Sequence, residues 1–176
     1  MAYITVSVEY GIHCLLWLVD NPERPLSSRE LAELQGISPS FLAKIFPRLE
    51  KAGIVRASEG IRGGYRLARP ATEITFLEMI DAIEGHKPLF ECQEVRQRCA
   101  LFDGTTPPDW VTSDRCAVHG VIRQAEKAMR DVLAGQTLGD VAARFGRTAP
   151  RSFFHDVSVW MDERETERTS RTRGKP

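Results

Sequence analysis

The chain has 176 residues, of which 42% are hydrophobic, and its 24 basic residues balance 24 acidic ones. This length suits one compact domain with appendages. The sequence contains neither an apolar run long enough to span a bilayer nor a signal peptide, so we expect a cytoplasmic protein with no membrane partner. In that compartment, clustered cysteines more often serve metals or redox chemistry than structural disulfides.

The balanced total hides a basic segment between residues 38 and 70. This segment holds seven basic residues against two acidic ones. A local excess of positive charge is typical of a surface that meets nucleic acid. The alternative is the solvated face of one helix and its loop.

Two helices are predicted first. Residues 5–19 are apolar almost all round and end at the breaker DNPERP, which indicates a buried or interface helix. The next segment, LSSRELAELQG, has Ser27 or Ser28 as its N-cap, Glu30 near the capping-box position and Gly36 as its stop. We therefore expect a hydrophobic helix followed by a short capped one.

A third helix is predicted in ISPSFLAKIFPRLEKAG. Ser38 is expected as its N-cap, Pro39 as its first residue and Gly53 as its stop. Pro47 lies inside this helix and should bend it or cost a hydrogen bond. Two short helices joined by a tight glycine-containing turn indicate a helix-turn-helix.

Two β-prone segments follow the helices. IVRAS and YRLAR flank the glycine-rich turn EGIRGG, which predicts a β-hairpin. Three helices and then a hairpin stand in the order of a winged-helix DNA-binding domain, and arginines in the hairpin suit phosphate contacts. The expected fold is therefore mostly α-helical with a small β-hairpin wing.

The predicted DNA contacts lie at the start of the third helix and in the hairpin. Small hydroxyls and a lysine at a helix N-terminus can reach phosphates or base edges, whereas hairpin arginines would mainly hold the backbone. Paired glycines would let the wing approach the sugar–phosphate chain, or they serve only a tight turn, and Ser38 could be no more than an N-cap. The predicted set is Ser38, Ser40, Lys44, Arg56, Arg62, Gly63, Gly64 and Tyr65, with Arg66 as a further backbone contact.

Three further helices are predicted in the second half of the chain. Residues 74–84 are amphipathic and end at Gly85. The long segment AVHGVIRQAEKAMRDVLAG carries an apolar seam that predicts pairing with a second copy, and TLGDVAARFG is a short last helix. The seam consists of Ile122, Ala125, Met129 and Val132.

The chain is expected to end in a polar tail. Its last 15 residues are rich in charge, Ser and Thr, which predicts disorder, although the cluster Phe153, Phe154, Val157 and Trp160 could dock. The predicted organisation therefore has four parts. They are a winged helix-turn-helix domain (1–85), a cysteine-containing loop (86–117), the dimerisation helix with the short last helix (118–145), and a partly disordered tail (146–176).

The loop gathers three of the four cysteines, Cys92, Cys99 and Cys116, in a polar stretch with adjacent prolines. Cysteines in such a loop could be paired, reactive, metal-bound or accidental. The fourth, Cys14, lies in the apolar first helix and is expected to be a small buried hydrophobic residue.

The sequence as a whole resembles a family of bacterial winged-helix regulators that includes the iron–sulfur regulator IscR, the nitric-oxide sensor NsrR and the redox sensor RsrR. The resemblance lies in VEYGIHCLLWL, SRELAELQGISPSFLAKIFPRLEKAGIVRAS, GGYRLARP, ITFLEMIDAIEG, FECQEVRQRC, CAVH and TLGDV, in this order between residues 3 and 143. It implies a homodimer whose long helices cross and which represses or activates transcription at palindromic DNA sites.

The resemblance also implies an iron–sulfur cluster, because Cys92, Cys99 and Cys116 occupy the place of the family's cluster cysteines. The remaining ligand differs between members. IscR-like proteins use the histidine of a C-x-x-H, which His119 matches, and NsrR-like proteins use a carboxylate in the first helix of the other subunit, which Glu9 matches. RsrR-like proteins use a Glu and a His of that helix with two cysteines, and the pair Glu9 and His13 matches them most closely.

Two features depart from the family pattern. The stretch ALFDGTTPPDWVTSD lengthens the interval between Cys99 and Cys116, which leaves open which two or three cysteines converge. In the wing, Glu59 and Gly60 stand where the family has Arg-Gly, and the arginine comes at Arg62. We therefore expect an operator that differs from those of the relatives.

The chemistry of the side chains supports the same candidate ligands. Glu9 and His13 are four residues apart, so both project from one helix face and can chelate one iron; the alternative is a hydrogen-bonded pair at a dimer interface. Their joint presence favours a 2Fe–2S over a 4Fe–4S cluster. For His119 the alternative is a solvated residue at a helix start. Zinc suits three cysteines and a histidine, but the spacing differs from the paired C-x-x-C of structural zinc sites.

Three functions therefore compete. The leading hypothesis is a dimeric transcription regulator whose DNA affinity is controlled by an iron–sulfur cluster that senses redox state, nitric oxide or iron–sulfur status. The second keeps DNA binding but switches by thiol–disulfide exchange among the loop cysteines. The third, an enzyme with a cysteine nucleophile, is not expected, because the sequence contains no recognisable triad or nucleotide-binding loop.

Overall fold

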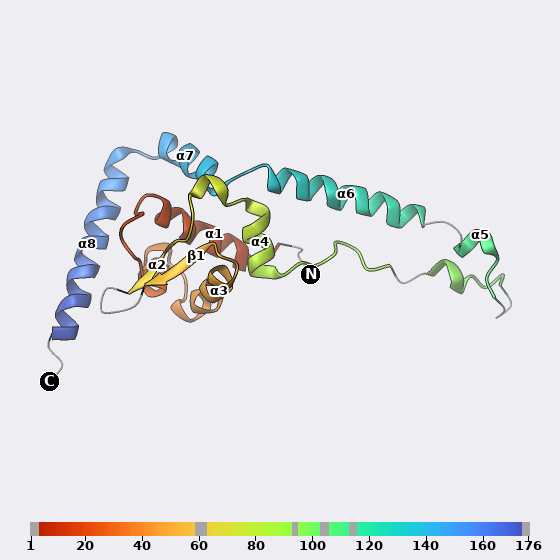
Figure 1. Cartoon of the computed structure of the whole chain (residues 1–176), viewed down its shortest axis with the longest axis horizontal. Coiled ribbons are helices and arrows are strands. Elements are labelled where there is room, and N and C mark those ends of the chain that lie inside the picture. Colours follow the sequence, from red (N-terminus) through yellow and green to blue (C-terminus); the bar gives the residue numbers. More distant parts are fainter. Residues whose placement is uncertain (1–3, 59–62, 93–94, 103–105, 113–115, 174–176) are drawn as a thin grey trace. The chain divides into compact units, whose positions relative to one another are not determined.

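The computed structural model of the chain consists of helices and one two-stranded sheet in the residues that it describes, which are 4–58, 63–92, 95–102, 106–112 and 116–173 (Figure 1). The chain divides into two compact units, 1–86 with 133–176 and 87–132. Within the described ranges, every helix is too short or too polar to cross a membrane.

The first unit contains the helix-turn-helix and the wing. The predicted fold class, mostly α-helical with a β-hairpin, is confirmed. The elements of this unit are α1 (Val6–Val19), α2 (Ser28–Gln35), α3 (Pro39–Lys51), β1 (Val55–Ser58), β2 (Gly64–Leu67), the short 3-10 turn η1 (Ala71–Glu73), α4 (Phe76–Glu84), α7 (Leu138–Thr148) and α8 (Arg151–Arg173).

Helix α1 packs against α2, α3, α4 and α7, as its apolar sequence predicts. Its approach to α3 and α4 is close at Gly11, where a Cβ would lie 2.6 Å from Cδ1 of Ile83 and 3.2 Å from Cγ2 of Ile45. A glycine at this position therefore lets three helices meet around one point of the core.

The ends of α2 follow the predicted signals. Ser27 is the N-cap: its Oγ accepts from the N–H of Glu30 at 3.1 Å, and its own N–H donates to Oε2 of Glu30 at 2.8 Å. Gly36 ends the helix in the left-handed region, with φ of 68°. Helix α3 then begins at Pro39 and continues through Pro47, whose ring is exposed.

The hairpin pairs β1 with β2 in antiparallel register, from Val55 opposite Leu67 to Ser58 opposite Gly64. A further bridge connects it to the segment before α2. The N–H of Leu26 donates to the carbonyl of Tyr65 at 3.1 Å, and the N–H of Tyr65 donates back at 2.8 Å. The wing is therefore attached to the start of the helix-turn-helix as well as to its end.

Two segments far apart in the sequence lie side by side where α4 and α7 begin. The N–H of Phe76 donates to the carbonyl of Gln136 at 2.9 Å, and the N–H of Leu138 donates to the carbonyl of Ile74 at 2.8 Å. Thr75 and Thr137, which face each other in this bridge, each form a capping box. The backbone of the first unit therefore joins the start of α4 to the start of α7.

The tail differs from the sequence expectation. In place of disorder beyond residue 161, the structure has α8 as far as Arg173. The reason lies in spacing and charge: Val157 and Met161, four residues apart, are 9% and 3% exposed, and Phe153 lies one turn earlier beside the ring of Trp17. The charged residues that suggested a solvated tail form ion pairs with the first unit.

The second unit contains the cysteine-containing segment and a long helix. Its elements are η2 (Val95–Arg98), α5 (Asp109–Thr112) and α6 (Ala117–Ala134), which continues past the end of the unit. The sequence predicted α6 but not the two short helical turns. Val111 is 1% exposed, and the rings of Phe102 and Trp110 lie edge to face with centroids 6.2 Å apart, so the segment has apolar contacts of its own.

Candidate functional site

The predicted recognition helix, α3, presents polar side chains at its N-terminal end. Ser38, Ser40 and Lys44 are all exposed. Ser38 is the N-cap, but its hydroxyl makes no capping hydrogen bond and lies 2.9 Å from the hydroxyl of Ser40 at the surface. Capping therefore does not account for this hydroxyl, which remains at the surface where a ligand can reach it.

Contacts on the other side of α3 hold these polar residues in place. Leu42, Phe46 and Leu49 are fully buried. Near the C-terminal end, Nη1 of Arg48 donates to the carbonyl of Ile83 at 2.6 Å, and a carboxylate oxygen of Glu50 accepts from the N–H of Ala57 at 3.0 Å. The helix is thus fixed to α4 and to β1, which gives its exposed face a defined orientation.

The predicted wing arginines occupy opposite strands of the hairpin. Arg56 in β1 is exposed and pairs in register with Arg66 in β2. Arg66 is half-buried and donates through Nη2 to Oγ of Ser58 at 3.1 Å. Arg62 lies outside the described residues, as does Glu59. The two described arginines give the hairpin a positive surface of the kind that holds phosphates.

The wing glycines have partners within the chain. A Cβ on Gly64 would lie 2.6 Å from the carbonyl carbon of Leu26 and 2.9 Å from the nitrogen of Ser27. The carbonyl of Gly63 accepts from Nη1 of Arg168 at 3.1 Å. The close approach that Gly64 permits is therefore an approach to the chain's own backbone before α2.

Tyr65 connects the wing to the recognition helix. Its ring lies against that of Phe46, with centroids 4.7 Å apart, and its backbone bridges to Leu26. Burial, together with the nearby charge of Glu50, raises the pKa of the Tyr65 phenol. Tyr65 is half-buried, and its contact with Phe46 fixes the hairpin on α3.

The two non-cysteine ligand candidates of α1 lie on its surface. Glu9 and His13 are both exposed and stand one helical turn apart. Between them, the ring of Tyr10 lies edge-on to that of Phe41 in α3, with centroids 5.5 Å apart. The surface that could bind a metal is thus joined to the recognition helix through one aromatic contact.

The loop cysteines lie in the second unit. Cys92 and Cys116 are half-buried and Cys99 is exposed, and all three are thiols. Cys116 directly precedes α6, where its carbonyl accepts from the N–H of Gly120 at 2.9 Å. The ring of His119 lies against a phenyl ring in the same unit, that of Phe90, at 5.8 Å between centroids.

The candidate ligands are divided between the two units, with Glu9 and His13 in the first and the three loop cysteines in the second. Among the described residues, no three His, Cys, Asp or Glu side chains are grouped closely enough to hold a metal ion. Their chemistry nevertheless fits an iron–sulfur cluster, for which thiolates are the usual ligands and imidazole a known replacement. The described residues thus include thiol, imidazole and carboxylate side chains, but neither unit brings three of them together.

Cys14 is excluded from this set by its environment. It is fully buried, and its Sγ lies 3.9 Å from the carbonyl of Leu31. Burial raises the pKa of the thiol to about 12, so the thiolate that a metal needs is disfavoured. The expectation that it is a small buried hydrophobic residue is confirmed.

Two contacts beside the proposed DNA-binding residues were not predicted from the sequence. One is the Tyr10–Phe41 pair, and the other is the contact of Arg168 with the wing. Helical spacing shows which residues share a face, but it does not show which helix that face meets. Arg168 lay in the segment expected to be disordered, although the spacing of Phe153, Val157 and Met161 was a signal for a docked helix.

Comparison with known proteins identifies a family and several relatives that share most of this chain. The Rrf2 family model, described as an iron-dependent transcriptional regulator, matches residues 4–144. Protein aau3 of Rhizobium meliloti is 32% identical over 139 residues, covering 78% of this chain and 83% of that protein. The HTH-type transcriptional regulator IscR of Klebsiella pneumoniae is 28% identical over 170 residues, covering 96% of this chain and 93% of its own. The structure of CymR, the global cysteine regulator of B. subtilis, matches with a TM-score of 0.64 at 24% identity, over 82% of this chain and 98% of CymR, and so shares the fold.

Proposed function

Because this chain belongs to the Rrf2 family of DNA-binding transcription regulators, we propose that it acts as a homodimer on palindromic operators and that an iron–sulfur cluster controls its DNA affinity. The cluster would respond to redox state, nitric oxide or iron–sulfur status. One observation carries the proposal: an exposed polar N-terminus of α3 and a set of three loop thiols occur in the same chain.

The reading surface consists of α3 and the wing. Ser38, Ser40 and Lys44 would enter the major groove, since all three are exposed at the end of a helix whose other face is buried. Arg56 and Arg66 would hold phosphates. The remaining wing contacts are proposed for Arg62, Gly63, Gly64 and Tyr65. About three to five phosphate contacts per subunit would make the affinity fall steeply with salt.

The dimer interface is proposed on α6. None of the 18 residues of this helix is buried in the single chain. Val132, in the predicted seam of Ile122, Ala125, Met129 and Val132, is 67% exposed, and the neighbouring Val118 and Val121 are 62% and 68% exposed. A helix with so much exposed apolar surface is stabilised when a second copy covers it. The opposite polar side carries an ion pair, Lys127 to Asp131 at 2.6 Å.

The cluster would be held by residues of both subunits. Cys92, Cys99 and Cys116 offer thiolates, and Glu9 with His13 of the other subunit offers the non-thiolate side; His119 is the alternative. Two non-thiolate donors favour 2Fe–2S over 4Fe–4S. When bound, such a cluster supplies one-electron redox chemistry, and the carboxylate and imidazole provide its more labile attachment. Both side chains are exposed on α1, where such an attachment can form and break.

The route from these ligands to DNA is short. Glu9 and His13 lie on α1, and Tyr10 of the same helix contacts Phe41, which follows Ser40 in α3. The missing side chain at Gly11 lets α1 pack directly on Ile45 of α3. A change in how α1 is held would therefore change the orientation of the recognition helix, because closely packed helices move together.

The deciding experiment is anaerobic purification followed by visible absorption spectroscopy with iron and sulfide analysis. A coloured protein with both elements is expected. Replacing Cys92, Cys99 and Cys116 together by Ser should abolish the colour, whereas Cys14→Ser, a change at a buried cysteine, should retain it. Alanine variants of Glu9, His13 and His119 would then identify the remaining ligands. A colourless protein without iron that still binds its operator normally would refute the cluster, and bound zinc would indicate a zinc site instead.

A thiol switch is the second candidate. It is favoured by the exposure of Cys99 and by the thiol state of the other loop cysteines. Oxidation would link two of these cysteines in a disulfide, with the electrons passing to a peroxide or a disulfide oxidant. Mass mapping of oxidant-treated protein distinguishes the two candidates, since a cluster should protect the cysteines and a thiol switch should leave them linked.

A further inference from the structure

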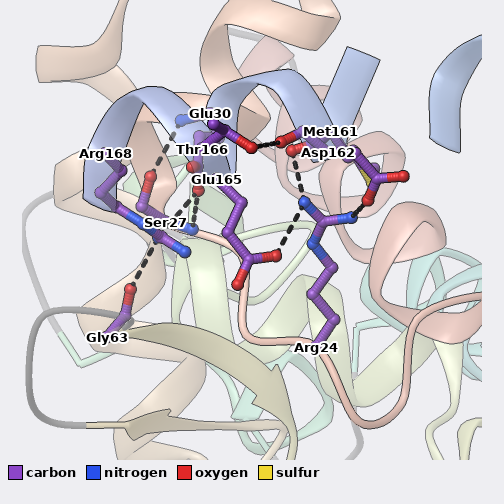
Figure 2. Close-up of polar contacts among 9 residues, drawn as sticks. All are labelled: Arg24, Ser27, Glu30, Gly63, Met161, Asp162, Glu165, Thr166 and Arg168. Carbon is purple, nitrogen blue, oxygen red and sulfur yellow. Dashed lines mark hydrogen bonds and ion pairs between the residues drawn. The ribbon is translucent and has the colours of Figure 1, made fainter. Parts of the chain in front are cut away.

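Helix α8 contacts both the helix-turn-helix and the wing. Figure 2 shows Arg168 reaching from α8 towards Glu30 in α2 and Gly63 beside β2. The Rrf2 match ends at residue 144, before α8 begins at Arg151. Helix α8 therefore lies outside the segment that the family model matches, and it reaches the proposed DNA-binding elements.

The first half of α8 is attached by apolar packing. Val157 and Met161 belong to the core of the first unit. The ring of Phe153 lies 6.0 Å from that of Trp17 in α1. Burial of several such side chains is worth a few kcal/mol, since each contributes roughly 1.5–3 kcal/mol. Because α8 is one continuous helix, this packing also places its second half beside α2.

The second half is held by Arg168, whose side chain is 21% exposed. Its Nη1 donates to Oε2 of Glu30 at 3.2 Å and to the carbonyl of Gly63 at 3.1 Å. Glu30, with 13% of its side chain exposed, is also the capping-box partner of Ser27. One guanidinium therefore joins α8, the N-terminus of α2 and the turn end of the wing, where Gly63 precedes β2.

A second anchor lies one to two turns earlier in α8. Arg24, in the segment before α2, pairs with Asp162 at 2.7 Å and with Glu165 at 3.1 Å, and also donates to the carbonyl of Met161 (Figure 2). Arg24 has 20% of its side chain exposed. This anchor holds α8 on the same segment to which Leu26 attaches the hairpin, so Arg168 meets Gly63 from a fixed base.

We infer that Arg168 is a positioning residue for DNA binding: by joining Glu30 to the carbonyl of Gly63, it holds the wing against α2 in the orientation that meets DNA. This inference rests on one part of the proposed function, which is that the wing contacts the phosphates of DNA. A hairpin of two four-residue strands is only marginally stable without support, so an added hydrogen bond at its turn end restrains it. The restrained wing loses less freedom on binding, which raises affinity.

The test uses two full-length variants with the same substitution. Arg168→Met keeps the length of the side chain but removes its donors, and Arg151→Met makes the same change at the exposed first residue of α8. Hydrogen exchange measured by mass spectrometry reports on the wing at residues 63–67 and, as an internal reference, on α1 and α4. DNA affinity is measured on the duplex that the unaltered protein enriches from a random-sequence pool.

Arg168→Met should speed exchange in the wing about threefold to tenfold without changing α1 and α4, and should weaken DNA binding by a similar factor. Arg151→Met should change neither. Unchanged wing exchange, or DNA affinity that is equal or higher in Arg168→Met, would overturn the inference. If the unaltered protein enriches no duplex, the proposed function fails instead, while the exchange measurement still decides whether Arg168 holds the wing.

Discussion

The ring of Tyr10 lies edge-on against the ring of Phe41, with centroids 5.5 Å apart and planes at 75°. Tyr10 directly follows Glu9, a proposed cluster ligand, and Phe41 directly follows Ser40, a proposed DNA contact. One aromatic pair thus lies between a metal-binding and a DNA-binding candidate. It gives the proposed regulation a specific contact that can be removed without touching either set of residues.

Removing the Tyr10 ring should uncouple the two sites. In the unaltered protein, we expect cluster-bearing and cluster-free forms to differ in DNA affinity by about 5-fold to 150-fold, the usual range of allosteric coupling. Tyr10→Ala should bring the two affinities together while iron content stays the same. Tyr10→Phe keeps the ring and should retain the difference. Titrations of both forms by fluorescence anisotropy measure it, and an undiminished difference in Tyr10→Ala would contradict the route through Phe41.

The surface hydroxyl of Ser38 should matter for DNA binding and little for stability. Since it makes no capping bond, Ser38→Ala should lower the free energy of unfolding by less than about 0.5 kcal/mol. Thr75→Ala, which breaks a complete capping box, should cost about 1 kcal/mol. Urea unfolding compares the two. A loss of DNA affinity in Ser38→Ala alone would complete the expected pattern, whereas equal stability losses would contradict it.

Gly64 should be intolerant of a side chain because the nearest atoms belong to backbone. Gly64→Ala would place a Cβ 2.6 Å from the carbonyl carbon of Leu26 and should cost about 1–3 kcal/mol as the hairpin shifts. Gly146→Ala, inside α7 with nothing within 4 Å, should stabilise by about 0.5–1 kcal/mol. Thermal and urea unfolding measure both. Similar effects at the two glycines would argue against the close contact.

The seam on α6 should control assembly. Met129→Glu places a charge on the proposed interface and should shift the protein from dimer to monomer in sedimentation experiments. Gln124→Glu adds the same charge on another side of the helix, where the residue is exposed, and should leave the dimer intact. An unaffected dimer in Met129→Glu would place the interface elsewhere.

Acid should weaken the first unit in part through Glu78. Burial raises the pKa of this carboxyl, but hydrogen bonds from Thr75 and Arg69 outweigh it, so the pKa lies below its usual value of 4.5. The carboxylate therefore stabilises the fold above pH 4.5, and this stabilisation is lost as the pH falls through the lowered pKa. Because 45% of the side chain is exposed, the effect should be small. Glu78→Gln should show a flatter fall in unfolding free energy with acid, and an unchanged profile would count against it.

The local signals in the sequence were sufficient for much of the fold. The capping box of Ser27, the stop at Gly36 and the hairpin are confirmed, and the resemblance to winged-helix regulators is confirmed by the family match. What they did not reveal depends on partners distant in sequence. The sequence indicated a solvated tail, whereas Asp162 and Glu165 of α8 pair with Arg24, and Arg168 pairs with Glu30. The N-cap position of Ser38 is confirmed, although its hydroxyl lies beside that of Ser40 and makes no capping bond.

The cluster site could be predicted only as chemistry. Cysteine spacing named Cys92, Cys99 and Cys116, and a four-residue interval named Glu9 and His13. Neither pattern tells how close in space two segments some eighty residues apart in the sequence lie. Within the described residues of one chain, no three such side chains are close enough to hold a metal ion. The proposed ligand set draws on a second subunit, and the local periodicity of one chain does not encode contacts between two chains.

The backbone bridge between Thr75 and Thr137 has a consequence for how such a regulator can diversify. The bonds of Phe76 and Leu138 join the start of α4 to the start of α7 within the first unit, so this contact is made without residues 87–132. Those residues can grow or shrink at little cost to the first unit, because loop length adds closure entropy only slowly. The long interval between Cys99 and Cys116 is a change of that kind. The cysteine-containing segment can therefore change in length while the helix-turn-helix and the wing stay the same.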